Sequence, residues 1–465
     1  MNIKDKYLEI REALGTSFDI TVEYLALKKD TGILAYVDGF IDRDLLNRDI
    51  IGAIRRADFD GNISGATSAI SKTVQTIDEF VTEILSGFLG LYLGEYYLFD
   101  LRKWEKRDIQ SPDAENVTRG PKEGFTEDLV TNSVLLRRKL RNTSFIMDSM
   151  KIGKQSNTTV VIGYIKGIAD TNIVEKVKSE LRKINVDGVM ESGKLEQYLD
   201  KRPYSTVSGI GVSQKPDIVA KRLLEGRIAI VCDGTPHVLT IPELFIENFK
   251  TAEDYYHRVL FGTFMRFMRF IGLSVSVLLP GLAVAVTTYN PEMLPVSYLT
   301  TIIRSVANTP FPESIEILFL ILMLELLKES GTRLPKTIGS AVSIVGALII
   351  GDAAVRAGIV GAPTVMIVAL TAVSSFIIPN LNEFTTVYRL VFLLLGALFG
   401  VIGIAAGIAI VLIQLASIDS FGVPILSYVS KSELKDSLIR FPLPELEYRP
   451  RNIAKGNIRR SRWLD

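Results

Sequence analysis

Charge is distributed very unevenly along the chain, and this constrains the fold more than any other feature. The whole sequence has 53 Lys and Arg and 52 Asp and Glu residues, but only 16 of these lie between Thr263 and Ser430. Long apolar runs with few charges are typical of membrane helices. The sequence therefore predicts a soluble front at residues 1–261, a transmembrane helical domain at 262–430 and a basic tail at 431–465.

The front domain contains a pattern that occurs twice. Residues 85–91 (LSGFLGL) correspond position by position to residues 224–230 (LEGRIAI), and each block follows a helical pattern and precedes strand patterns. We therefore predict two related α/β cytoplasmic subdomains, at 1–150 and 151–261. The predicted elements are a helix at 71–85, two strands within 88–99, a helix at 217–224, and strands at 227–232 and 237–241.

Between these blocks the pattern indicates further elements. Residues 124–140 are predicted to form a helix, and 159–166, 173–184 and 186–190 a strand, a helix and a strand, as in a βαβ unit. The first helix ends in a basic cluster, Arg137, Arg138, Lys139 and Arg141. A solvated helix end is the favoured interpretation, and contact with another subunit or with anionic headgroups is the alternative.

The membrane half contains five apolar segments and one weaker, amphipathic segment at 293–307. Residues 270–286 follow Arg266 and Arg269, which indicates that this span starts on the cytoplasmic side. Residues 293–307 are expected to lie along the outer surface as an amphipathic helix. The basic tail predicts an even number of crossings, and we expect four. The remaining segments are 315–327, which is short and a candidate re-entrant helix, the pair 337–350 and 359–378, and the 27-residue run 390–416.

A few polar or small residues interrupt these runs. Glu325 lies in the last turn of its segment, and Asp352 and Arg356 are four residues apart, a spacing at which they share a helix face and can pair. Ionisable groups at membrane depth are costly and usually serve a function. Gly396, Gly400, Gly403 and Gly407 form small-xxx-small patterns that allow helices to approach closely.

Several functional classes are excluded by composition. The net charge of +1 gives no reason to expect a nucleic-acid partner. His237 and His257 are too few for a histidine-rich metal site or a plausible catalytic triad, and Cys232, in an apolar setting, is expected to be a buried thiol. The N-terminus has no apolar signal region, so the front domain is expected to stay on the cytoplasmic side. Because the sequence contains no recognisable active-site motif, we expect no enzyme activity and no cofactor, which leaves a channel, a transporter or a signalling subunit.

Six blocks, in one order along the chain, resemble the A subunit of the GerA-type spore germination receptors. They are 119–127 (RGPKEGFTE), 225–231 (EGRIAIV), 253–256 (EDYY), 310–312 (PFP), 325–335 (ELLKESGTRLP) and 345–358 (VGALIIGDAAVRAG). One block departs from the family: where members usually have Thr-Glu-Arg-Pro-Asp, this chain has Ser213-Gln214-Lys215-Pro216-Asp217. A role that depends on the acidic and basic pair at those two positions is therefore in doubt.

The resemblance implies a function. Similar proteins act in the inner membrane of bacterial spores with a transporter-like, nutrient-binding B subunit and a lipoprotein C subunit, and are thought to form a ring with a nutrient-gated cation pathway. In this interpretation Glu325, Asp352 and Arg356 line or gate the pathway, and the front domain and tail lie on the core side. Two alternatives remain: the charges serve only folding, or the chain is a non-conducting transducer. A lone solute transporter is disfavoured because no inverted repeat is visible.

Overall fold

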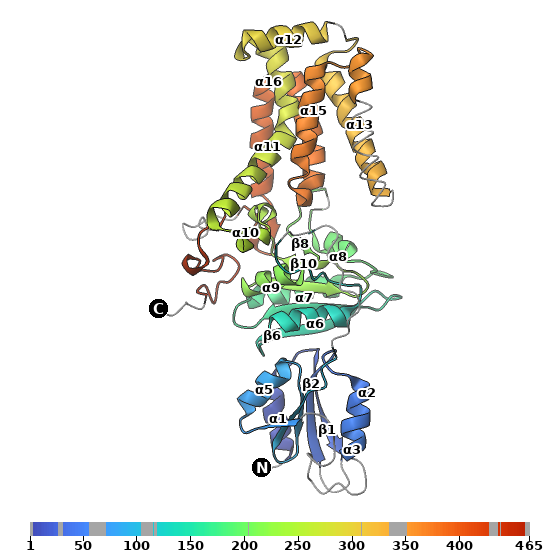
Figure 1. Ribbon diagram of the computed structural model, residues 1–465, viewed down its shortest axis with the longest axis vertical. Helices are drawn as coiled ribbons and strands as arrows, with labels where there is room; N and C mark the ends of the chain where they lie inside the picture. The colour runs from blue at the N-terminus through green and yellow to red at the C-terminus, as the bar shows by residue number, and fades with distance from the viewer. Residues whose placement is uncertain are drawn as a thin grey trace.

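The computed structural model describes residues 3–26, 31–54, 71–103, 115, 119–202, 204–307, 309–333, 351–426, 436–437 and 439–460. These residues form three layers along the long axis of the molecule: a first subdomain at the N-terminal end, a second subdomain, and a group of helices (Figure 1). The predicted fold class, tandem α/β subdomains followed by a helical region, is confirmed.

The first subdomain is a five-stranded antiparallel sheet in the order β1-β2-β4-β5-β3. Its core includes Phe40, Phe80 and Phe99. The predicted helix at 71–85 is wrong over its first turns: Ser71–Val74 pairs with β5, and the helix begins at Ile77 because the Thr76 side chain accepts the Glu79 N–H. The elements are α1 (Ile3–Leu14), β1 (Ile20–Ala26), β2 (Thr31–Val37), α2 (Arg43–Leu45), α3 (Gly52–Ile54), β3 (Ser71–Val74), α5 (Ile77–Leu85), β4 (Leu89–Tyr92) and β5 (Tyr96–Phe99).

The second subdomain repeats this strand order as β6-β7-β9-β10-β8, again antiparallel throughout. The predicted relation between the two subdomains is thus confirmed. Helix α6 and strand β6 both pack in this subdomain, so it begins ahead of residue 150. The elements are α6 (Leu129–Lys139), β6 (Phe145–Ile152), β7 (Thr158–Ile165), α7 (Thr171–Lys183), α8 (Ser192–Leu199), β8 (Gly211–Ser213), α9 (Pro216–Leu224), β9 (Ile228–Cys232) and β10 (Val238–Ile241).

Two expectations for this subdomain are wrong. Residues 186–190 form a loop rather than a strand, because β7 already has β6 and β9 as neighbours, and the carbonyls of Val186 and Asp187 accept N–H groups from residues 154–156. The βαβ unit is therefore absent from the described residues. Helix α6 starts at Leu129, five residues later than expected, where the Asp128 side chain accepts the Thr131 N–H.

The third layer consists of helices α10 (Glu253–Tyr256), α11 (Val259–Tyr289), α12 (Val296–Val306), α13 (Glu313–Arg333), α15 (Ala362–Ser375) and α16 (Asn382–Ala416). Helix α12 lies across the end of the group farthest from the subdomains (Figure 1). Among the described residues, two stretches are long and apolar enough to be candidate membrane spans by length and composition, Val259–Tyr289 and Pro379–Ala416.

Helix α13 is longer than the predicted apolar segment at 315–327. It begins just after Pro312 and extends to Arg333, which pairs with Glu329 one turn earlier. Its 21 residues measure about 32 Å. Of the predicted pair that follows, 337–350 lies outside the described residues, and the 359–378 segment contains α15.

Helix α16 is not the single span predicted for residues 390–416. Gly400 has φ 61° and ψ −148°, which interrupts the helix and reverses the chain. As a result, Tyr388 on the first limb donates a hydrogen bond to Gln414 on the second (2.5 Å), although 26 residues separate them. The apolar stretch that passes for one long helix is thus a hairpin of two antiparallel limbs.

The C-terminal segment returns to the second subdomain. Ile453 and Ala454 are fully buried there, and Arg449 donates to the Leu224 carbonyl (2.8 Å). Part of the tail's positive charge therefore fixes this segment to the subdomain.

Candidate functional site

A charged cluster lies among the helices, near their subdomain-facing ends. Arg389 on α16 donates through Nη1 to Glu325 Oε1 on α13 (3.0 Å) and through Nε to the Ser276 carbonyl on α11 (2.9 Å). Lys328, one turn after Glu325, reaches the same carboxylate oxygen (3.2 Å) and lies 3.5 Å from Ser375 Oγ on α15. Four helices therefore meet at one carboxylate.

The cluster is buried to different degrees. Arg389 is fully buried, whereas the side chains of Glu325 and Lys328 keep 26% and 18% of their surface exposed. A buried guanidinium is costly to leave without a counter-ion, so Glu325 stabilises Arg389 in this conformation. The carboxylate itself remains partly accessible from outside the helices.

A fully buried carboxylate, Glu316, lies nearer the start of α13. Glu316 accepts the Gly361 N–H and the Thr364 hydroxyl, both at 2.9 Å, and so caps the start of α15. Its other oxygen has no hydrogen-bond partner among the described residues. Sequence reasoning missed Glu316, although an acidic residue within the apolar run 315–327 was a visible signal.

The three predicted pathway residues do not come together. Arg356 pairs with Asp352 (2.7 Å), and both side chains are exposed, by 78% and 53%. Gly361, five residues after Arg356, donates its N–H to Glu316 on α13. Glu325 lies nine residues after Glu316, about 14 Å farther along this helix, and is therefore distant from the Asp352–Arg356 pair. Glu325 instead meets Arg389, which sequence reasoning missed because it immediately precedes the apolar run at 390–416.

The four predicted packing glycines lie in and around the hairpin. A Cβ at Gly396 would collide with the Gly281 carbonyl of α11, and Gly400, at the reversal, lies against the Tyr289 ring. Gly403 faces the Leu395 carbonyl and Gly407 faces Phe392, both on the opposite limb. Side chains at these positions would push the backbones apart.

Another set of buried charges joins the start of α11 to α10 and to the C-terminal segment. Arg266 donates through Nε to Asp254 (3.0 Å) and through Nη2 to Asp436 (3.2 Å), and Arg269 donates through Nη1 to Asp254 (2.9 Å) and to the Phe249 carbonyl (2.9 Å). Burial alone would raise the pKa of Asp254, but hydrogen bonds and charge from Arg269 and Arg266 outweigh it and lower that pKa. The start of α11 is thus fixed by two guanidinium groups and two carboxylates.

A further buried arginine joins the two subdomains, and it corrects the expectation of a solvated basic helix end. Arg137 is fully buried and forms a two-pronged ion pair with Asp19 of the first subdomain (2.7 and 2.8 Å). Arg138 and Lys139 do lie near the surface, where both face Glu123.

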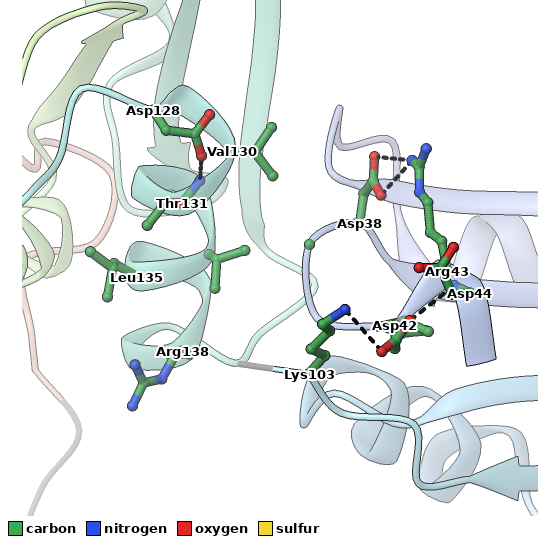
Figure 2. A pocket seen from close by; sticks show the side chains of 13 residues that line it. Asp38, Asp42, Arg43, Asp44, Lys103, Asp128, Val130, Thr131, Leu135 and Arg138 are labelled. Atoms are coloured by element: carbon green, nitrogen blue, oxygen red, sulfur yellow. Dashed lines mark hydrogen bonds and ion pairs between the residues drawn. The ribbon is translucent and has the colours of Figure 1, made fainter. Parts of the chain in front are cut away.

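A cleft of about 720 Å³ opens beside this contact, between the turn at residues 38–44 and α6. Figure 2 shows that five of its charged residues already have partners within the chain, namely Asp38, Asp42, Arg43, Lys103 and Asp128. Asp38 binds Arg43 through both oxygens, Asp42 pairs with Lys103 (3.0 Å), and Asp128 accepts the Thr131 N–H. The cleft lies in the subdomain layers and not at the helical cluster.

Comparison with known proteins gives a consistent result. A family model described as Bacillus/Clostridium GerA spore germination protein matches residues 8–452. The chain is 34% identical to spore germination protein KA of Bacillus subtilis (strain 168), over 96% of this chain and 86% of that protein. It is 40% identical to the uncharacterized membrane protein YfkQ of the same organism, over 77% of this chain and 71% of that one.

Among solved structures, the chain is similar to the N-terminal domain of the A subunit of the Bacillus megaterium spore germinant receptor GerK3. The match has 24% identity and a TM-score of 0.40, and covers 52% of this chain and 95% of that one. The family match over nearly the whole length is decisive: this chain belongs to the GerA family of spore germination proteins.

Proposed function

We propose that this chain is the A subunit of a nutrient-responsive germination receptor in the spore inner membrane. It acts with a transporter-like, nutrient-binding B subunit and a lipoprotein C subunit, and several copies form a ring whose helices carry cations when nutrient is bound. The family membership and the similarity to spore germination protein KA support the receptor assignment. The front domain and the tail lie on the core side, since both lie at the same end of the helices (Figure 1).

The observation that carries the conduction proposal is the buried cluster at Glu325. A carboxylate that is partly exposed and held by Arg389 and Lys328 is neutralised in this conformation. Separating α13 from α16 would break the 3.0 Å contact to Arg389 and leave Glu325 with Lys328 of its own helix, a flexible partner that a cation in the pathway could replace. In this proposal Glu325 is the gate of the cation pathway, and the exposed Asp352–Arg356 pair lies at the other end of that pathway.

Neutralising the gate tests this proposal. We expect Glu325→Gln to change nutrient-triggered ion release at least severalfold, because the charge that Arg389 holds is lost. Glu329→Gln is the matched control, since it removes a carboxylate one turn away that pairs with Arg333 at the exposed end of α13. Normal accumulation and normal release by both variants, and by Asp352→Asn, would show that these charges serve folding alone.

Cysteine scanning of α13 tests whether this chain conducts. Single cysteines are placed at Ile315, Phe319, Leu322 and Leu326, which form an exposed stripe, with Ile317 as a buried control, after replacement of Cys232. A water-soluble thiol reagent should block flux at one or more positions of the stripe and not at Ile317. Modification of the stripe without any change in flux would favour the alternative function below.

The alternative, a non-conducting transducer, is favoured by one observation. The ion pairs of Arg266 and Arg269 with Asp254 attach α11 to α10, and Tyr256 of α10 donates to Asp217 of the second subdomain (2.7 Å), so movement of that subdomain would be passed to the helices. This connection serves a scaffold that relays the nutrient signal to another channel equally well.

A further inference from the structure

The Glu325 cluster has more positive charge than its own chain balances. Arg389 and Lys328 are two cations, and Glu325 is the one carboxylate that the structure places in contact with them. A surplus charge among apolar helices is unfavourable unless a counter-ion lies close to it. One further negative charge would therefore balance the charge of the cluster.

Two buried polar atoms mark where that charge is missing. Arg389 is fully buried, and its Nη2 has no hydrogen-bond partner among the described residues. The hydroxyl of Thr386, one turn earlier on α16, is buried and also without a partner there. Guanidinium N–H groups and hydroxyls both donate to phosphate oxygens, and buried donors without partners are rare in folded proteins.

The surroundings favour a lipid as the source of the charge. Lys328 lies on the partly exposed side of the cluster, with its ammonium 5.7 Å from the Phe376 ring centroid. Phe376 is 65% exposed, so apolar surface adjoins the cationic group. Ser375 is the last residue of α15 and Lys328 lies five residues before the end of α13, and these ends of the two helices face the subdomains (Figure 1), where a membrane would place its headgroups.

We propose that this cluster binds the phosphodiester headgroup of an anionic phospholipid of the leaflet next to the subdomains. The phosphodiester carries a single negative charge, which matches the surplus. Lys328 would donate directly to its oxygens and Arg389 Nη2 would donate after a small movement of the helices, and Phe376 would contact the acyl chains. This inference requires the helices to lie in a membrane, but it does not depend on ion conduction.

The test uses the purified full-length protein in detergent, titrated with dioleoyl phosphatidylglycerol, dioleoyl phosphatidylcholine or inorganic phosphate. Native mass spectrometry counts bound lipid, and a thermal shift reports stabilisation. We expect phosphatidylglycerol to bind best. Lys328→Gln should weaken it about fivefold, and Thr386→Asp, which supplies an internal carboxylate one turn from Arg389, should weaken it further. Arg333→Gln, which removes a basic group from the exposed end of α13, should leave it unchanged.

Several results would overturn the proposal. Equal binding of both lipids, or phosphatidylglycerol binding that neither Lys328→Gln nor Thr386→Asp changes, would show that the cluster does not hold a lipid headgroup. Binding of inorganic phosphate with the same dependence on these variants would assign the site to a soluble anion instead. If Thr386→Asp does not accumulate, Lys328→Gln and its control decide alone. Because flux is not measured, failure here is separate from failure of the conduction proposal.

Discussion

Two clusters of buried arginines hold the helices in place, and they differ in the balance of charge around them. At the start of α11, Arg266 and Arg269 face Asp254 and Asp436, and each guanidinium group donates hydrogen bonds to its neighbours. Among the helices, Arg389 and Lys328 share Glu325, and one guanidinium nitrogen has no partner within the described residues. A balanced cluster is what a fixed joint requires, whereas an unbalanced one can change its partners.

The largest effect is expected at the balanced cluster. Asp254→Asn leaves two buried guanidinium groups with one carboxylate, and should lower the free energy of unfolding by about 3–5 kcal/mol. Chemical unfolding of the purified protein and its level in membranes measure this, with the exposed Glu445→Gln as control. A loss below about 1 kcal/mol would show that the joint is not held by charge.

The same residue gives a pH dependence. Because its pKa is lowered in the folded state, Asp254 contributes stability above its ordinary pKa of 3.8, and this contribution is lost as the pH falls through and below that value. The Asp254→Asn variant should lack this part of the acid sensitivity. Parallel unfolding curves for both proteins between pH 7 and pH 3 would contradict the expectation.

Close backbone packing around the unbalanced cluster should produce a smaller effect. Gly396→Ala forces α16 away from the Gly281 carbonyl, and should cost about 1–3 kcal/mol. Gly456→Ala is the matched control, because nothing lies near its added Cβ. Equal unfolding midpoints for the two variants would mean that α16 can move away from α11 without cost.

At the unbalanced cluster itself, Lys328→Gln should change the free energy of unfolding by less than about 1 kcal/mol. It removes the surplus charge and leaves the Arg389–Glu325 pair intact. Glu325→Gln should be clearly more costly, since both cations then lose their carboxylate. The difference in the free energy of unfolding between these two variants measures how far the cluster depends on its single carboxylate rather than on its second cation. Equal values would contradict the distinction between a balanced and an unbalanced cluster.

The smallest effect is expected from the ionisation of Cys232, which should not change the free energy of unfolding at neutral pH. Its thiol is buried, and burial raises its pKa to about 12. A maleimide at pH 8 should therefore leave the folded protein unmodified and react after unfolding. Stability should fall only as the pH rises above about 9, because the unfolded thiol then releases its proton first. Rapid labelling of the folded protein would show that β9 is less buried than described.

The sequence predicted the parts of the fold that local patterns encode. The duplication at 85–91 and 224–230 identified two related subdomains because each block links the end of a helix to the following strand through the same pattern of residues. The reversal at Gly400 was missed because an apolar hairpin and an apolar span have the same composition. Arg137 was misjudged because its partner, Asp19, is 118 residues away. Arg389 was missed for a similar reason, since Glu325 is 64 residues away.

The reversal at Gly400 also has a consequence for the bilayer. Residues 382–399 and 401–416 measure about 27 Å and 24 Å as helices, which is less than the hydrocarbon thickness of about 30 Å. Helix α11 is longer, about 46 Å, but Arg266 and Arg269 fix its first part to carboxylates outside the apolar helices, and its apolar run at 270–286 measures about 26 Å. All three apolar helices are therefore shorter than the hydrocarbon layer, and this hydrophobic mismatch should thin the lipid around them. We expect the stability of the helical layer to depend on acyl chain length.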